Sequence, residues 1–124
     1  MAKYAFLIEP VPQYLSEDSD PGQHIHAFAY TISITNTGSV AAQLISRHWK
    51  IQDDNGHIEE VTGLGVVGHQ PLLQPGESFE YTSGCALATP VGTMKGAYQM
   101  VGEDGTRFDA EIPEFVLAVP HVLH

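Results

Sequence analysis

Hydrophobic and polar residues alternate along several short stretches of the chain, with the two-residue period of a β-strand. In residues 27–36 one face carries large apolar side chains, and the other carries small or hydroxyl side chains. The apolar face consists of Phe28, Tyr30, Ile32 and Ile34. This pattern predicts a half-buried strand, and the Asn-Thr-Gly-Ser sequence at residues 36–39 predicts the turn that ends it.

The second half of the chain shows the same alternation, separated by turn signals. Residues 107–112 alternate apolar and charged side chains, and the Asp-Gly pair at residues 104–105 precedes them, which predicts a β-hairpin. The Pro-Gly pair at residues 75–76 predicts another turn. It leads into a strand with Phe79 and Tyr81 on one face.

Residues 39–56 allow two interpretations. Ala41, Ile45 and Trp49 would line up on one side of a helix, and no proline or glycine interrupts the stretch before Gly56. Because strands and turns surround it, we interpret the stretch as a strand that ends in a turn at residues 53–56. We then expect Trp49 to be buried between two sheets.

Together these patterns predict about seven or eight short strands with turns every 8–12 residues, which is typical of a β-sandwich. The fold class is therefore all-β, with antiparallel strands. We find no internal repeat and no linker, so residues 1–124 are expected to form a single domain. Residues 1–3 and 118–124 are expected to be frayed ends.

Composition and charge limit the classes of function. The chain has 124 residues, 43% of them hydrophobic, which is enough to bury a core without disulfides. The formal net charge of −10 repels phosphate backbones, so we expect no nucleic-acid partner. No apolar run approaches the ~20 residues of a membrane helix. No signal peptide is predicted, and the single cysteine fits a reducing compartment, so we expect the cytoplasm.

A glycine pattern at residues 63–68, GLGVVG, has the G-x-G-x-x-G spacing of dinucleotide-binding loops. That loop needs a helix after the last glycine, and Pro71 and Pro75 disfavour a helix there. No acidic residue lies between Tyr81 and Gly102, where the ribose contact is expected.

A structural role for these glycines is therefore favoured over a nucleotide site. Gly63, Gly65 and Gly68 are expected to shape a tight loop or a bulged strand. Val66 and Val67 are expected to anchor this loop in the core.

The chain offers few candidates for metal binding or catalysis. His24 and His26 would face the same side of a strand, but a site needs three or four ligands, so only weak divalent-cation binding is expected. No base is placed beside Cys85 by any motif, and no catalytic residues and no cofactor are predicted. His48 is expected to pack in or near the core. His121 and His124 lie in the predicted frayed tail.

The residues from Gly63 to Val101 carry a specific combination of motifs. The order "GVVG-QP-L-PGE-F-YTSG" followed by "TP-G-M-G-Y-MV", together with "YTISITNTGS" and "PQYL" in the first half, resembles the ApaG family. This resemblance implies a fibronectin type III-like sandwich, similar in architecture to immunoglobulin domains. In bacteria it links the family genetically to cobalt tolerance and magnesium efflux. No enzyme activity is implied.

Two hypotheses on function follow. The first is a non-enzymatic binding module whose loops or edge strands contact another protein. The alternative is a small-ligand protein that binds a polyphosphate, a nucleotide or a divalent metal. The genetic neighbourhood of a diadenosine-tetraphosphate hydrolase in the family, the acidic charge and the seven histidines motivate this alternative.

Overall fold

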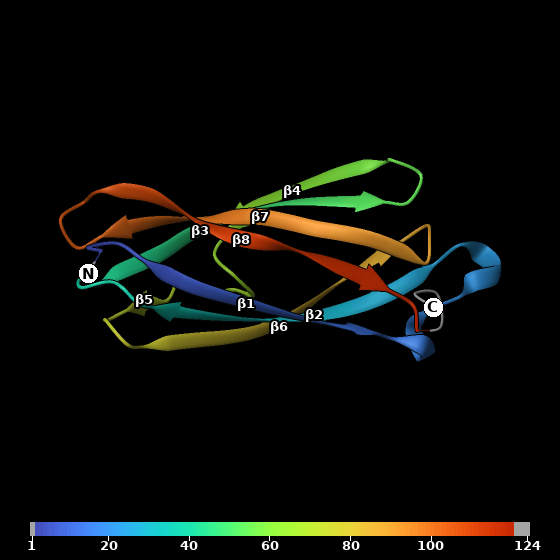
Figure 1. The fold of residues 1–124 in the computed structure, drawn as a ribbon, viewed down its shortest axis with the longest axis horizontal. Coiled ribbons are helices and arrows are strands. Elements are labelled where there is room, and N and C mark those ends of the chain that lie inside the picture. Colours follow the sequence, from blue (N-terminus) through green and yellow to red (C-terminus); the bar gives the residue numbers. More distant parts are fainter. Residues whose placement is uncertain (1, 121–124) are drawn as a thin grey trace.

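The computed structural model describes residues 2–120, which form two β-sheets packed face to face (Figure 1). The three-stranded sheet has the order β1-β2-β6, formed by Phe6–Tyr14, His26–Asn36 and Ser78–Leu87. The second sheet has the order β4-β3-β7-β8, formed by Ile58–Leu64, Ala42–Asp53, Val91–Gly102 and Arg107–Ala118. The short β5, Leu72–Leu73, pairs with β3. All pairings are antiparallel, so the predicted all-β sandwich is confirmed.

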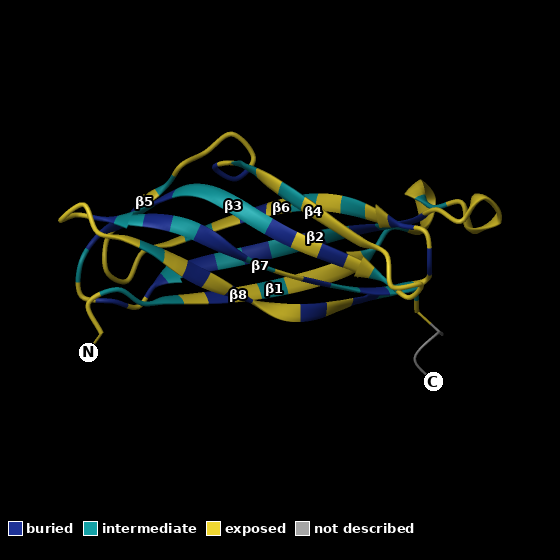
Figure 2. Ribbon diagram, turned by 90° about the horizontal axis from the view of Figure 1, so that it is seen from above, coloured by how far each residue is buried: buried dark blue, intermediate teal, exposed yellow. Residues whose placement is uncertain are grey.

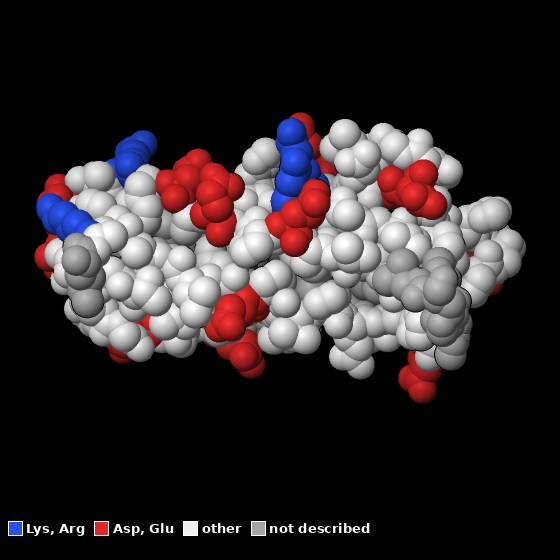
Figure 3. Space-filling model, in the orientation of Figure 1, with Lys and Arg blue, Asp and Glu red and all other residues white. Residues whose placement is uncertain are grey.

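Helical structure within residues 2–120 is limited to two short 3₁₀ turns between β1 and β2. They are η1, Ser16–Asp18, and η2, Pro21–Gln23. Across the same residues, no helix has the length and apolar character needed to span a membrane. Acidic side chains are scattered over the surface in Figure 3, with few basic ones among them.

The core lies between the sheets, and the predicted alternation of β2 fills one side of it. Its four predicted inward side chains, Phe28, Tyr30, Ile32 and Ile34, are all buried. Figure 2 shows buried and exposed residues alternating along the strands. Trp49 is 2% exposed, and its ring lies 5.4 Å from that of Tyr30 and 6.0 Å from that of Phe115. The prediction that Trp49 packs between the sheets is confirmed.

The ambiguous stretch before Trp49 is strand β3, and a β-bulge explains why its pattern was difficult to interpret. Ala42 and Leu44 face the core, and the pairing with β7 then shifts between Leu44 and Ser46. Ile45 is the extra residue. Beyond it the odd-numbered residues Trp49 and Ile51 face the core, so the alternation changes phase within one strand.

The predicted turns join the strands as expected. Gly105 has a φ of 84° in the hairpin between β7 and β8, and Gly76 has a φ of 86° in the turn before β6. Asn36 ends β2 and is buried. Its side-chain amide donates to the carbonyl oxygens of Val40 and Leu73, each at 2.9 Å.

The ends of the sandwich extend beyond the predicted limits. Lys3 Nζ donates to Asp104 Oδ2 at 2.8 Å, which joins the first residues to the hairpin between β7 and β8. Ala118 is the last residue of β8, and Val119 N donates to Pro90 O at 2.9 Å. Lys3, Ala118 and Val119, which we expected to be frayed, therefore belong to the folded structure. Residues 1 and 121–124, including His121 and His124, lie outside the described residues.

Candidate functional site

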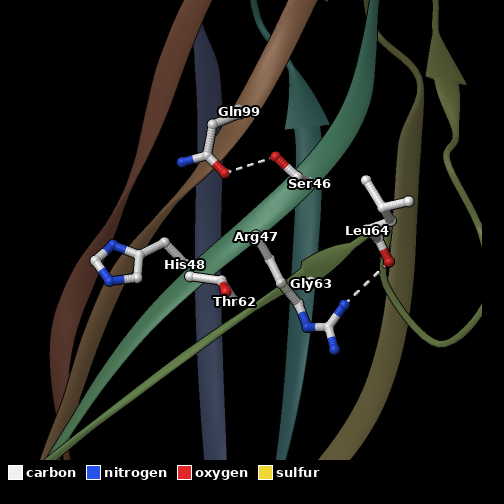
Figure 4. Close-up of a pocket in the computed structure, with 7 residues that line it drawn as sticks. All are labelled: Ser46, Arg47, His48, Thr62, Gly63, Leu64 and Gln99. Atoms are coloured by element: carbon white, nitrogen blue, oxygen red, sulfur yellow. Dashed lines mark hydrogen bonds between the residues drawn. The ribbon is translucent and has the colours of Figure 1, made fainter.

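The glycine stretch at residues 63–68 is held in place by an arginine on the neighbouring strand. Arg47 of β3 donates from Nη1 to the carbonyl oxygens of Leu64 at 3.1 Å and Gly65 at 2.8 Å. Figure 4 shows the guanidinium directed toward Leu64 at the end of β4. Sequence reasoning missed Arg47. Beyond the bulge at Ile45, Arg47 lies two residues before Trp49 and therefore on the same side of β3.

The end of this stretch is a tight hairpin turn. Val66 N donates to His69 O at 2.8 Å, and His69 N donates to Val66 O at 2.9 Å. The two central residues, Val67 and Gly68, have φ angles of 44° and 83°, the arrangement of a type I′ turn. Val66 is fully buried, as predicted, whereas Val67 is 53% exposed. The prediction that Val67 anchors the loop in the core is therefore wrong, because the turn points its side chain outward.

The three glycines differ in what surrounds them and in backbone conformation. Gly65 has a φ of 63°, and a Cβ there would lie 2.4 Å from the carbonyl oxygen of His69. A Cβ on Gly63 would lie 2.8 Å from both terminal nitrogens of Arg47. Gly68 has positive φ but open space around it. Backbone conformation and close packing thus account for all three positions.

The stretch does not offer the arrangement that a phosphate group needs. A phosphate cradle presents free backbone N–H groups at the start of a helix. Here Gly65 N donates to Ile45 O at 2.8 Å. The N–H group of Val66 donates to the carbonyl oxygen of His69, and the N–H group of His69 donates to the carbonyl oxygen of Val66. The chain then continues into β5 rather than into a helix.

Beside this stretch lies a shallow depression on the outer face of the second sheet, with a volume of about 540 Å³. Its lining residues are Ser46, Arg47, His48, Thr62, Gly63, Leu64 and Gln99 (Figure 4). Ser46 Oγ donates to Gln99 Oε1 at 2.8 Å. His48 Nε2 lies 3.2 Å from Glu60 Oε1 on this outer face, so the prediction that His48 packs in or near the core is wrong.

Two tyrosines in the core behind Arg47 form a buried hydroxyl pair. The hydroxyl oxygens of Tyr81 and Tyr98 are 2.5 Å apart. Removal from water raises the pKa of Tyr81 to about 12. Burial also raises the pKa of Tyr98 well above its ordinary range, and the neighbouring Tyr81 raises it further. Both hydroxyls therefore remain protonated in the folded protein.

We expect the protein to lose stability as the pH rises above about 10, the ordinary pKa of an unfolded tyrosine. The unfolded chain then releases these protons while the folded chain retains them, up to the Tyr81 pKa of about 12. Urea unfolding midpoints measured at about pH 8 and about pH 11 would show the loss. Tyr98→Phe should reduce this pH-dependent loss. An equal loss in the variant and the wild type would contradict the assignment.

The residues proposed for metal binding or reactivity do not assemble into a site. His26 begins β2 and is buried, whereas His24 precedes the strand, is exposed and has a φ of 58°. The expectation that the two histidines share one face of a strand is therefore wrong. Within residues 2–120, no three His, Cys, Asp or Glu side chains are grouped to hold a metal ion. Burial raises the pKa of Cys85 to about 11, which disfavours the reactive thiolate.

Comparison with known proteins decides the family. A family model described as the ApaG domain matches residues 16–102. The chain belongs to the ApaG family. Protein ApaG from Dechloromonas aromatica is 64% identical over 98% of this chain and 96% of its own length. Protein ApaG from Thiobacillus denitrificans is 65% identical with the same coverage.

Solved structures agree with this placement of the ApaG domain. A crystal structure described as the putative ApaA protein from Bordetella pertussis has a TM-score of 0.94 and 57% identity. It covers 97% of this chain, and the chain covers 98% of it. The predicted resemblance to the ApaG family is therefore confirmed. The Gly63–Gly68 stretch, its contact with Arg47 and the depression beside them all lie within the residues that the ApaG model matches.

Proposed function

We propose that this ApaG domain is a non-enzymatic module that binds another protein, and that the turn at Val67 forms part of the contact surface. The observation that carries this proposal is the conformation of Val67. It is a β-branched residue in the left-handed region, with a φ of 44°, and its side chain is exposed. Such a conformation costs roughly 1–2 kcal/mol, and strained exposed residues concentrate at functional surfaces.

Two further exposed apolar side chains flank the turn in sequence. Leu64 is 76% exposed and Leu72 is 57% exposed. We call Leu64, Val67 and Leu72 the Val67 tip. Figure 2 shows the segment between β4 and β5 projecting from the sheets with exposed residues at its end. Single exposed apolar residues are ordinary, but three within one short segment favour contact with a partner.

The proposal also covers the cation phenotype that the family resemblance implies. We propose that any effect on cobalt or magnesium in the cytoplasm passes through a protein partner rather than through metal held by this chain. The separation of His24 from the strand that carries His26 supports this, because it removes the one pair of ligands that the sequence offered. The raised pKa of Cys85 likewise supports a non-enzymatic role.

Replacing Val67 with asparagine tests the proposal, because asparagine tolerates the left-handed conformation and forms the favoured Asn-Gly turn with Gly68. We expect Val67→Asn to raise the free energy of unfolding by about 1 kcal/mol. We also expect it to reduce the amount of partner protein captured from a bacterial lysate by cross-linking to the immobilised domain.

Val11→Asn is the matched control, because Val11 is a 63% exposed valine on β1, away from the tip. It should capture the same partner as the wild type. Equal capture by wild type and Val67→Asn, with the expected gain in stability, would show that the tip is not a contact surface. If both variants capture less partner protein than the wild type, the reduction is not specific to Val67.

A further inference from the structure

The two long sides of the sandwich differ in how they are closed. Figure 2 shows β1 and β8 along one side and β4 and β6 along the other. On the β1–β8 side, the ring of Phe108 stacks on Tyr4 at 4.7 Å and on Phe6 at 6.1 Å, which seals the edge. Within residues 2–120, β6 pairs only with β2 and β4 pairs only with β3, so no backbone pairing closes the other side.

A groove runs along this open side between β6 and β4. It consists of two adjoining cavities of about 290 Å³ and 220 Å³, both lined by Ile51, Glu59 and Ala86. We call it the edge groove. Its floor is apolar and buried, formed by Trp49, Ile51 and Leu87 among others. An apolar floor beside an unpaired strand is suited to the alternate side chains of an added strand.

The charges of the edge groove differ between its ends. Arg47 lines one cavity, beside Ser83 of β6. Asp53 and His57 line the other cavity, and Glu59 lies where the two meet. None of the ion pairs among the described residues involves Arg47 or Glu59. The groove can therefore receive an acidic side chain at the Arg47 end and a basic side chain near Glu59 and Asp53.

The backbone of β6 presents hydrogen-bonding groups to this groove. Asn36 N donates to Glu77 O at 3.0 Å where the pairing of β2 and β6 begins. Hydrogen-bonded pairs recur at every second residue of an antiparallel ladder, so the odd-numbered residues of β6 bond to β2. The even-numbered residues Glu80, Thr82, Gly84 and Ala86 thus direct their N–H and C=O groups to the free edge. Gly84 and Ala86 also line the groove.

The other edge strands carry features that oppose the addition of a strand. β1 contains Pro10 and Pro12, β8 contains Pro113, and β4 contains the charged pair at residues 59–60. Between Tyr81 and Leu87, β6 has no proline and no charged residue, and its register with β2 is continuous. Folded proteins usually protect a long edge strand, so an unprotected one indicates a strand that is used for pairing.

We propose that β6 is a docking edge, which accepts an extended segment of another protein as a fourth strand of the three-stranded sheet. Every second side chain of that segment enters the edge groove. Apolar or small side chains cover Trp49 and Ile51, a basic one lies near Glu59, and an acidic one lies near Arg47. This goes beyond the proposed function, because it names a second surface and an unfolded segment as its occupant. It holds even if the Val67 tip binds nothing.

The test uses the full chain and phage-displayed random peptides of about twelve residues, long enough to span β6 in extended form. We expect selection to enrich peptides with alternating β-branched residues. Bound peptide should slow amide hydrogen exchange at Thr82, Gly84 and Ala86 at least tenfold, measured by nuclear magnetic resonance, and should change the fluorescence of Trp49. No enrichment, or enriched peptides that leave these three amides unchanged, would overturn the proposal.

Ala86→Pro removes one edge N–H group without removing a hydrogen bond to β2, and Ala86→Ser is its matched control. The enriched peptides should bind Ala86→Pro at least tenfold more weakly than the wild type and bind Ala86→Ser unchanged. Circular dichroism would verify that Ala86→Pro is folded. If it is not, Glu59→Lys provides the second variant, which should weaken peptides that carry a basic residue at that position. Unchanged binding to folded Ala86→Pro, or to Glu59→Lys where Ala86→Pro does not fold, would also overturn the proposal.

Discussion

Replacing Trp49 with alanine should lower the free energy of unfolding by about 3–5 kcal/mol. Trp49 is the only tryptophan and is 2% exposed. Its ring meets those of Tyr30, Tyr98 and Phe115, with centroid separations of 5.4, 6.4 and 6.0 Å. Truncation removes contacts to both sheets and leaves a cavity that the stiff strands close only in part.

Urea unfolding followed by circular dichroism would measure this change, because the variant lacks the fluorescent reporter. Val116→Ala is a suitable control, since Val116 lies on β8 and is 48% exposed. It should change stability by less than about 0.5 kcal/mol. A change below about 1 kcal/mol for Trp49→Ala would contradict the packing described between the sheets.

Strands in which apolar and polar residues alternate without interruption could be predicted from the sequence. β2 keeps one phase over its whole length, so Phe28, Tyr30, Ile32 and Ile34 could be assigned to the core directly. β3 could not be assigned in this way. Its bulge at Ile45 changes the phase, which places Leu44 and Trp49 on the same face although their separation is odd.

The features of the candidate site that were missed depend on contacts between distant residues. Arg47 reaches Leu64 and Gly65 because β3 and β4 pair with Arg47 opposite Gly63. That pairing register cannot be derived from the sequence of either strand alone. The exposure of Val67 follows from a turn type that its Val-Gly sequence does not favour. Likewise, whether β6 lies at an edge depends on the order of strands in the sheet, which alternation within β6 cannot reveal.

Gly65→Ala should lower the free energy of unfolding by about 3 kcal/mol, more than the same change at Gly68. An alanine at position 65 must adopt a φ near 63°, which costs roughly 1–2 kcal/mol. Its Cβ would also lie 2.4 Å from the carbonyl oxygen of His69, in a turn closed by two backbone hydrogen bonds. Displacing that backbone adds a packing cost of roughly 1–3 kcal/mol.

Gly68→Ala is the matched control, because Gly68 has a φ of 83° but nothing within 4 Å of an added Cβ. It should cost about 1–2 kcal/mol, from conformation alone. Urea unfolding of both variants, together with titration of the wild type with ATP, NAD and diadenosine tetraphosphate, separates backbone shaping from ligand binding. Saturable nucleotide binding that Gly65→Ala abolishes without loss of stability would contradict the structural role. We expect a destabilised Gly65→Ala protein, a less destabilised Gly68→Ala protein and no nucleotide binding. The N–H groups of Gly65, Val66 and His69 already bond within the chain, and a strand rather than a helix follows the turn.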